Sequence, residues 1–352
     1  MIDPHVHCRD WNESHKETIA HALLVAERAG ISGIFDMPNT NPPIISRELA
    51  IKRIEDAGKV DSKVFYGLYF GLTSDPKQIE EAVQTYNELF PSVVGFKIYA
   101  GHSVGNLAIS VEEEQRRIYK TLAELGYKGV VAVHCEKESL FNQELWNPHY
   151  PRTHSLARPA IAETESIKDQ IHFASESDFK GTLHIAHISH PESVLLVNQA
   201  RKNTSLKITC GVTPHHCLLG NELMTGENGI LYKVNPPLRS GADCEIMVKY
   251  LHEGLIDFIE TDHAPHTLHE KLNAPYMSGF PGLPFVPHFL RFLLHIGFSE
   301  ERITYRTHQR ICEAFNIDIK DTPMHVDYGL EQEYEVDVYE PIRQKFKQRL
   351  IS

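Results

Sequence analysis

Eight short apolar runs rich in β-branched residues recur along the chain, and they constrain its fold more than any other feature. Runs of this kind are typical of strands that are covered on both faces, as in parallel sheets. Segments with helical periodicity separate them, and repeated alternation of strand and helix is the pattern of a (β/α)₈ barrel. We therefore predict an α/β fold of the TIM-barrel type. The predicted strands are residues 1–7, 31–37, 63–70, 93–99, 129–135, 182–189, 206–212 and 256–261.

Several of the predicted helices begin at residues that suit a helix N-terminus. Ser, Thr, Asp and Asn side chains satisfy the free N–H groups of a first turn, and proline fits the first helical position. A Ser or Thr followed three residues later by Glu forms a capping box. The predicted start residues are Ser14, Ser46, either Ser74 or Asp75, Ser110 with Glu113 as a capping box, and Pro191.

Two long segments interrupt the alternation of strands and helices. They span residues 136–160 and 213–240, after the fifth and seventh predicted strands, and both would lie at the C-terminal face of the barrel. Barrel enzymes build their active sites at that face. We assign residues 1–317 to the barrel and 318–352 to a C-terminal extension packed on it, in which EYEVDVY is a predicted extra strand.

Composition excludes several classes of protein. The net charge of −12 over 352 residues argues against a nucleic-acid or anionic-membrane partner. No apolar run approaches the length of a membrane span, and the N-terminus lacks the pattern of a signal peptide. The six cysteines are far apart, which favours reduced thiols in the cytoplasm.

Residues of the metal-binding type recur at one end of the predicted strands. His5 and His7 are two apart, so both side chains point to the same face. An HxH pair alone is a weak signal, but the joint pattern is much less expected by chance. Imidazole and carboxylate groups that converge on one barrel mouth would suit a divalent metal. The other residues of this pattern are Lys97, His134, His184, His187 and Asp262.

Two kinds of neighbouring residue are ambiguous. Cys8, Cys135 and Cys217 each stand beside a histidine and are candidate ligands, although a free cysteine is more often a small buried apolar residue. A buried Lys97 could react as a neutral amine with CO₂ to give a carbamate, or it could bind a substrate anion as an ammonium group. The residues alone favour neither role for the lysine.

Taken together, the motifs resemble those of the dihydroorotases in the amidohydrolase superfamily. The resemblance runs from residue 2 to about residue 284, and it is specific as a set although single motifs are weak. In order along the chain the motifs are DPHVHCR, MPNTNPP, GFKIYAG, VAVHCE, ARPAIAE, HIAHIS, VTPHH, KVNPPLR and TDHAPH.

The resemblance implies a site with two Zn²⁺ ions bridged by a carbamate on Lys97. His5, His7, the carbamate and Asp262 would hold one ion, while the carbamate, His134 and His187 would hold the other. His187 is preferred to His184 because it directly precedes the Ile-Ser pair of the family motif. His184 would then be a packing or supporting residue.

The resemblance also implies an activity, the reversible hydrolysis of dihydroorotate to N-carbamoyl-aspartate in pyrimidine (UMP) biosynthesis. Asp262 would be the catalytic residue that takes a proton from water and passes it to the leaving nitrogen. The guanidinium of Arg9 matches the substrate carboxylate, with Asn39 and His266 as partners. Asn235 and the backbone near Pro281 and Gly282 would contact the ring amides.

The sequence departs from the family pattern in three places. DWNE follows Arg9 where many relatives have Pro-Gly, and GFPGLPF lacks the acidic residue that often follows its second glycine. The chain also begins at the first barrel strand. We therefore expect a barrel without the N-terminal half of the β-sandwich that many relatives build from both termini.

Two alternatives remain open. Hydantoinases and allantoinases share the metal ligands but generally lack an arginine after HxH, so Arg9 favours dihydroorotase. A non-catalytic scaffold for a carbamoyltransferase would be expected to lose metal ligands, whereas all six candidate positions here carry suitable residues. A homodimer and an association with aspartate carbamoyltransferase are further expectations.

Overall fold

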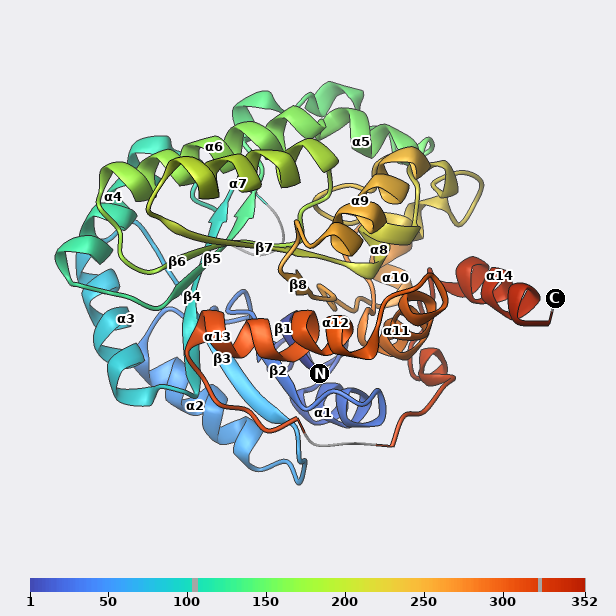
Figure 1. Ribbon diagram of the computed structural model, residues 1–352, viewed down its shortest axis with the longest axis horizontal. Helices are drawn as coiled ribbons and strands as arrows, with labels where there is room; N and C mark the ends of the chain where they lie inside the picture. The colour runs from blue at the N-terminus through green and yellow to red at the C-terminus, as the bar shows by residue number, and fades with distance from the viewer. Residues whose placement is uncertain (103–106, 322–324, 352) are drawn as a thin grey trace.

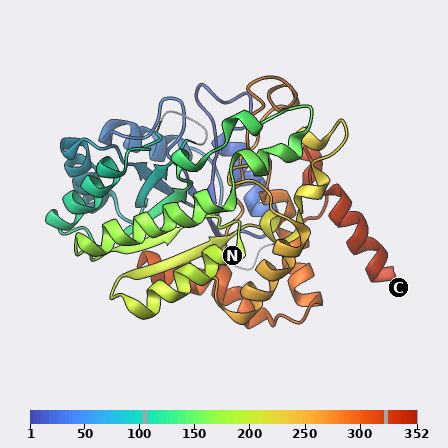
Figure 2. The same cartoon turned by 90° about the horizontal axis from the view of Figure 1, so that it is seen from above.

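The computed structural model describes residues 1–102, 107–321 and 325–351. Eight parallel strands form one sheet in the order β1 to β8, and the helices surround it (Figures 1 and 2). The predicted (β/α)₈ barrel and all eight of its strands are therefore confirmed. The strands are β1 (Ile2–Val6), β2 (Gly33–Asp36), β3 (Phe65–Gly71), β4 (Val93–Ala100), β5 (Val130–Cys135), β6 (Thr182–Ile185), β7 (Lys207–Val212) and β8 (Phe258–Ile259).

Helices follow the strands and pack on their outer side. The α-helices are α1 (Ile19–Arg28), α2 (Arg47–Gly58), α3 (Pro76–Leu89), α4 (Glu112–Glu124), α5 (His154–Ala157), α6 (Ala160–Glu176), α7 (Pro191–Asn203), α8 (Pro214–Leu218), α9 (Gly241–Glu253), α10 (Leu268–Leu272), α11 (Val286–His295), α12 (Glu300–Thr304), α13 (Arg310–Phe315) and α14 (Glu340–Ile351). The short 3₁₀ helices are η1 (Glu138–Leu140), η2 (Gln143–Leu145), η3 (Pro151–Thr153), η4 (Asn221–Leu223), η5 (Gly229–Tyr232), η6 (Leu283–Phe285) and η8 (Leu330–Glu333), and η7 (Tyr305–Gln309) is a π-helix. No helix of the described ranges is both long and apolar enough to span a bilayer.

The barrel closes between its first strand and the segment that follows its last strand. Val6 forms a parallel bridge with His263, and the amide of His7 donates to the His263 carbonyl at 2.8 Å. Closer to the amino end of β1, the buried Asp3 carboxylate accepts hydrogen bonds from the amide and hydroxyl of Thr261. The barrel is thus closed between β1 and the residues after β8 by one bridge, one backbone hydrogen bond and the side chain of Asp3.

The amino end of the barrel is filled by apolar side chains. Phe315 of α13 places its ring 5.0 Å from Phe35, 6.1 Å from Tyr69 and 6.3 Å from Phe258, measured between centroids. Ile2, Val94 and Val130, at the starts of their strands, belong to the same cluster. This end is therefore closed by apolar packing, and a polar site is expected at the opposite end of the barrel.

Helix starts agree with the sequence prediction in three places and differ in two. Ser46 and Asp75 cap α2 and α3, and Pro191 lies in the first turn of α7. Thr18, rather than Ser14, caps α1, because residues 11–16 form turns and the helix begins at Ile19. The predicted box of Ser110 and Glu113 is absent, since α4 begins at Glu112 with Val111 in the cap position.

The ends of two strands were predicted too far along the chain. β6 stops at Ile185 and β8 at Ile259, so His187 and Asp262 lie beyond their strands. The predicted strand EYEVDVY is also wrong, because residues 333–339 form no strand. Its apolar residues instead pack as single anchors, and Tyr339 stacks on Phe285 with centroids 3.9 Å apart.

Residues after α13 contact the barrel through polar side chains as well. The hydroxyl of Tyr334 donates to the buried Glu17 carboxylate at 2.7 Å, and Arg28 of α1 pairs with Asp327 and Glu333. Figures 1 and 2 show α14 projecting away from the body of the molecule. The division at residue 317 remains a proposal.

Candidate metal centre

Buried polar side chains gather at the carboxyl end of the strands, opposite the apolar plug. Their elements are far apart in sequence, but parallel strands of a barrel bring the carboxyl ends together. All six residues predicted as ligands are less than 9% exposed: His5 on β1, His7 just after it, Lys97 on β4, His134 on β5, His187 after β6 and Asp262 after β8.

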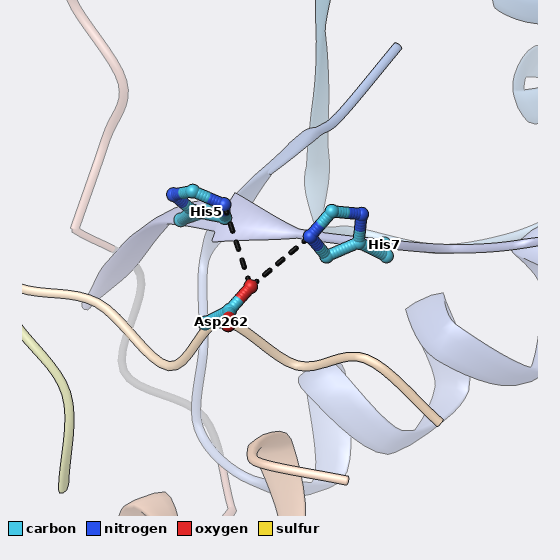
Figure 3. A group of neighbouring side chains, drawn as sticks. All are labelled: His5, His7 and Asp262. Carbon is cyan, nitrogen blue, oxygen red and sulfur yellow. Dashed lines mark hydrogen bonds and ion pairs between the residues drawn. The ribbon is translucent and has the colours of Figure 1, made fainter. Parts of the chain in front are cut away.

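His5, His7 and Asp262 form the tightest group. Both histidine Nε2 atoms point to the same carboxylate oxygen, with distances to Asp262 Oδ1 of 3.4 Å from His5 and 3.0 Å from His7 (Figure 3). One donor atom from each of the three side chains lies within 4.8 Å of the others. Two imidazoles and a carboxylate around one point are a suitable donor set for a divalent metal.

His134 and His187 form a second pair of imidazoles. His134 Nδ1 lies 3.2 Å from His187 Nε2, so these two nitrogens face each other. The other ring nitrogen of His134, Nε2, lies 2.9 Å from Glu136 Oε2. A carboxylate on the far nitrogen fixes the tautomer that leaves the near nitrogen free to bind a metal. The rings of His5 and His187 are 4.9 Å apart, so the two groups adjoin.

Lys97 extends from β4 into the same region with no hydrogen-bond partner for its Nζ in the described part of the chain. Burial lowers the pKa of Lys97 to about 8, although the carboxylates of Glu260 and Asp262 oppose that shift. A depressed pKa increases the fraction of neutral amine, which is the form that reacts with CO₂. The lysine therefore has the environment that a carbamate would require.

The donor set fits a cation. Burial lowers the pKa of His5, His134 and His187, and the charge of Lys97 adds to the effect, so these imidazoles are held neutral. Neutral imidazole is the form that binds metals. His187 Nδ1 is buried without a hydrogen-bond partner among the described residues. Neutral imidazoles with free ring nitrogens are therefore available to a divalent cation at this place.

Two carboxylates behind the ligands were missed by the sequence analysis. Glu136 pairs with Arg158, whose Nε donates to Glu136 Oε1 at 3.0 Å. Burial opposes ionisation of Glu136, but the charge of Arg158 and the hydrogen bonds from His134 and Arg158 outweigh it and hold its pKa below the ordinary value. The only sequence signal was its place two residues after His134, on the same strand extension.

Glu260 is the second of these carboxylates. It accepts from the backbone amide of His187, and its Oε2 lies 3.2 Å from His184 Nε2 and 3.8 Å from His5 Nδ1. His184 also contacts Thr209 and is not among the described residues that line the pocket. Glu260 thus links one predicted ligand of each group, and its signal in the sequence was its place directly after β8, two residues before Asp262.

Three of the site residues have a left-handed backbone conformation. Arg9, His187 and Asp262 have φ angles of 48°, 39° and 49°. These values are uncommon for residues with a side chain and occur where the surrounding structure imposes them. Arg9 lies three residues beyond the end of β1 at Val6, so its direction is set by this left-handed backbone and not by the alternation of a strand.

Five of the six candidate ligands line a pocket whose volume is about 360 Å³, including space that is open to solvent. Of the predicted substrate-binding residues, Arg9, Asn39 and Asn235 line it, and His266 lies behind Arg9 with Nε2 3.0 Å from Arg9 Nη2. Arg9 is 2% exposed, and its Nε donates to the Pro265 carbonyl at 3.1 Å. The remaining lining residues are Tyr99, Val234, Ala264, Ser278 and Gly279 with His5, His7, His134, His187 and Asp262.

The candidate cysteine ligands and the remaining histidine pair lie elsewhere. Cys8, Cys135 and Cys217 are buried thiols, and none belongs to the ligand group found in the described ranges. His216 is held between Thr213 and the Pro236 carbonyl, and His215 Nδ1 lies 3.5 Å from the Tyr339 hydroxyl. The three cysteines that stand beside a histidine in the sequence are therefore packing residues.

Comparison with known proteins places this chain in a family. No family model matches the chain. It is 32% identical over 291 residues to the dihydroorotase of Aeropyrum pernix, covering 82% of this chain and 63% of the relative. It is 31% identical over 327 residues to the dihydroorotase of Halobacterium salinarum, covering 91% of this chain and 72% of the relative. The chain thus spans about two thirds of the length of these relatives.

Solved structures share the fold. L-hydantoinase from Arthrobacter aurescens superposes with a TM-score of 0.78 at 23% identity, covering 93% of this chain and 73% of that one. A dihydroorotase from Campylobacter jejuni gives a TM-score of 0.67 at 18% identity, covering 91% and 84%. At these identities the likeness concerns the barrel alone. The sequence identities to the curated relatives, however, establish that this chain belongs to the dihydroorotase family.

Proposed function

We propose that this protein is a zinc-dependent dihydroorotase that interconverts dihydroorotate and N-carbamoyl-aspartate in pyrimidine biosynthesis. The observation that carries the proposal is Arg9, a buried guanidinium that lines the same pocket as five of the six candidate metal ligands, all except Lys97. Family membership supports the class of reaction, and the pocket chemistry supports a small anionic substrate.

The ligand assignment follows the two groups of side chains. His5, His7 and Asp262 would hold one Zn²⁺, and the facing nitrogens of His134 and His187 would hold the other. A carbamate on Lys97 would bridge them, which replaces a repelled ammonium group with an anion. Bound zinc would supply Lewis acidity, which favours deprotonation of water and polarises the amide carbonyl.

Asp262 is the proposed proton carrier. In ring opening, the oxygen of water bonds to the amide carbon and the carbon–nitrogen bond breaks. The carboxylate of Asp262 takes the proton from that water and delivers it to the departing ring nitrogen. Its place between His5 and His7, at the edge of the pocket, lets it serve both as ligand and as base.

Arg9 is the proposed determinant of substrate choice. Its planar donors match the exocyclic carboxylate of dihydroorotate, a group that hydantoin lacks. Asn39 and His266 would assist this contact, and Asn235 would contact the ring amides. The backbone near Pro281 and Gly282 is the other proposed contact with the ring.

A substrate comparison tests the assignment. The purified protein, supplied with zinc and bicarbonate, is expected to open dihydroorotate and to process hydantoin and allantoin far less efficiently. Arg9→Ala should raise KM for dihydroorotate about 100-fold, since it removes a charge-assisted pair, without changing zinc content. Arg152→Ala is the control, because this arginine is exposed on the 136–160 segment. Equal turnover of hydantoin and dihydroorotate would overturn the proposal.

The scaffold alternative is tested by metal content. A non-catalytic homologue would bind no zinc and show no activity when zinc and bicarbonate are supplied, whereas we expect close to two zinc ions per chain. A homodimer, an association with aspartate carbamoyltransferase and a cytoplasmic location remain proposals. Light scattering of the protein alone and with the carbamoyltransferase would test the first two.

A further inference from the structure

Lys271 is a buried lysine that belongs to none of the groups described so far. It lies in α10 with a fully buried side chain, and its Nζ lies 2.8 Å from the carbonyl oxygens of both Lys233 and Gly279. It forms no ion pair with any residue in the described ranges. Burying an amino group without a carboxylate partner costs free energy, and the two backbone hydrogen bonds of Lys271 offset part of that cost.

The two carbonyls belong to separate walls of the pocket. Lys233 directly precedes residues 234–235, which line the pocket on the segment after β7. Gly279 itself lines the pocket, together with Ser278, on the segment after β8. The same Lys233 carbonyl also accepts from the Gly279 amide at 3.0 Å. Lys271 therefore joins the two segments at the point where they meet beside the substrate space.

This contact does not depend on the charge of the lysine. Burial lowers the pKa of Lys271 well below its ordinary value, and the neighbouring charge of Lys233 adds to the shift. A neutral amine still carries two N–H groups, and an ammonium carries three. Either form can donate to both carbonyls, so the link holds in both protonation states.

Gly279 has little room to move independently of this link. Its φ angle of +119° favours glycine, and a Cβ at this position would lie 2.8 Å from both the side chain and the carbonyl oxygen of Ala264. Ala264 is held to the same segment by a hydrogen bond from its amide to the Phe280 carbonyl at 3.0 Å. The wall is thus limited by Ala264 on one side and fixed by Lys271 on another.

We propose that Lys271 is a positioning residue that sets the spacing between the Asn235 and Gly279 walls of the substrate pocket. It does not line the pocket and acts only through the two carbonyls. The inference rests on the proposed function for its substrate, dihydroorotate, but its structural part is measurable without that substrate.

Lys271→Met is the main test, because methionine keeps the apolar stem and removes both hydrogen bonds of Nζ. We expect KM for dihydroorotate to rise at least about tenfold while kcat falls much less, since a small misplacement of a binding wall is costly. Zinc content should stay at the parent value. Arg306→Met is the matched control: Arg306 is 7% exposed and donates to the Arg302 carbonyl, outside the pocket. It should leave KM unchanged.

Hydrogen exchange gives a readout that does not need activity. The amides of residues 278–280 should exchange about tenfold faster or more in Lys271→Met than in Arg306→Met, because their local opening becomes easier. Parent-like KM together with parent-like exchange in Lys271→Met would overturn the inference. If the parent protein fails to open dihydroorotate, the proposed function fails, and the exchange comparison still decides the role of Lys271.

A second variant covers the case in which Lys271→Met does not fold. Gly279→Ala leaves Lys271 intact but forces the same wall away from Ala264. We expect KM to rise by a similar factor with zinc content unchanged. A folded Gly279→Ala protein with the parent KM would show that the position of this wall is irrelevant to the substrate, and the inference would be wrong.

Discussion

The two ends of the barrel use the same strands for opposite purposes. At the amino end, Phe35, Phe258 and Phe315 fill the interior with aromatic contacts. At the carboxyl end, the interior holds imidazoles, a carboxylate and Lys97, whose Nζ lacks a hydrogen-bond partner within the described residues. Apolar packing fills the first end, whereas the second end gathers polar side chains, and His187 Nδ1 also lacks a hydrogen-bond partner among the described residues. The difference indicates that stability and chemistry are separable along each strand.

The largest expected effect is at the open end. Asp262→Asn keeps the shape of the side chain but removes the charge and the basic oxygen. We expect kcat to fall about 1,000-fold or more, as for loss of a general base, with only a small change in the melting temperature. Steady-state kinetics and thermal unfolding measure the two quantities. Retention of a tenth of the parent activity would break the assignment of Asp262.

A substitution at the closed end should have an effect of similar size, but on the free energy of unfolding and not on catalysis. Phe315→Ala removes a ring that contacts three strands and should lower the free energy of unfolding by about 3–5 kcal/mol. Urea unfolding measures this change. At temperatures where the variant remains folded, kcat and KM should match the parent values. A changed KM in the folded variant would show that the two ends are coupled.

A smaller effect is expected from the carboxylate behind His134. Glu136→Gln leaves Arg158 without its buried counter-ion and weakens the orientation of the His134 ring. Loss of such a supporting group typically lowers metal affinity by about 10–100-fold. Competition with a chelator measures the affinity. Glu165→Gln, at a half-buried glutamate on α6 that pairs with Lys168, is the control and should bind zinc like the parent protein.

The smallest effect concerns the residues after the barrel. Tyr334→Phe removes the hydroxyl that donates to Glu17, while the contacts of Glu17 with His21 and His263 remain. The loss should be about 1 kcal/mol of stability, the ordinary contribution of one hydrogen bond. Tyr328→Phe, at an exposed tyrosine, should change nothing measurable. Equal stability of both variants would weaken the proposal that residues 318–352 pack as an extension of the barrel.

Sequence reasoning succeeded where a property is local and periodic. Buried parallel strands can be recognised in the sequence as apolar runs, so the barrel could be predicted. The predicted ligands lie at or just beyond the carboxyl ends of these strands, so the proximity of His5, His134 and Asp262 could be predicted as well. The cap predicted at Ser14 failed because Thr18, closer to the helix, caps α1. The cap predicted at Ser110 failed because α4 begins at Glu112 with Val111 in the cap position and no side-chain cap. The strand EYEVDVY failed because alternating apolar residues can also serve as isolated anchors.

The supporting residues could not be predicted because their roles depend on partners distant in sequence. Glu136 acts through Arg158, Glu260 contacts residues of β1 and the segment after β6, and Lys271 joins carbonyls 38 and 8 residues away. None of these pairs has a spacing that a helix or strand would produce. Only the folded barrel brings them together.

The left-handed backbone at Arg9, His187 and Asp262 has a consequence for engineering. Each such residue costs on the order of 1–3 kcal/mol relative to a relaxed backbone. Glycine would relieve that cost at all three positions and would remove a guanidinium, an imidazole or a carboxylate from the pocket. A selection for thermal tolerance that ignored turnover would therefore favour replacements at these positions. Libraries intended to make this protein more robust should leave them unchanged and draw their gains from the opposite end of the barrel.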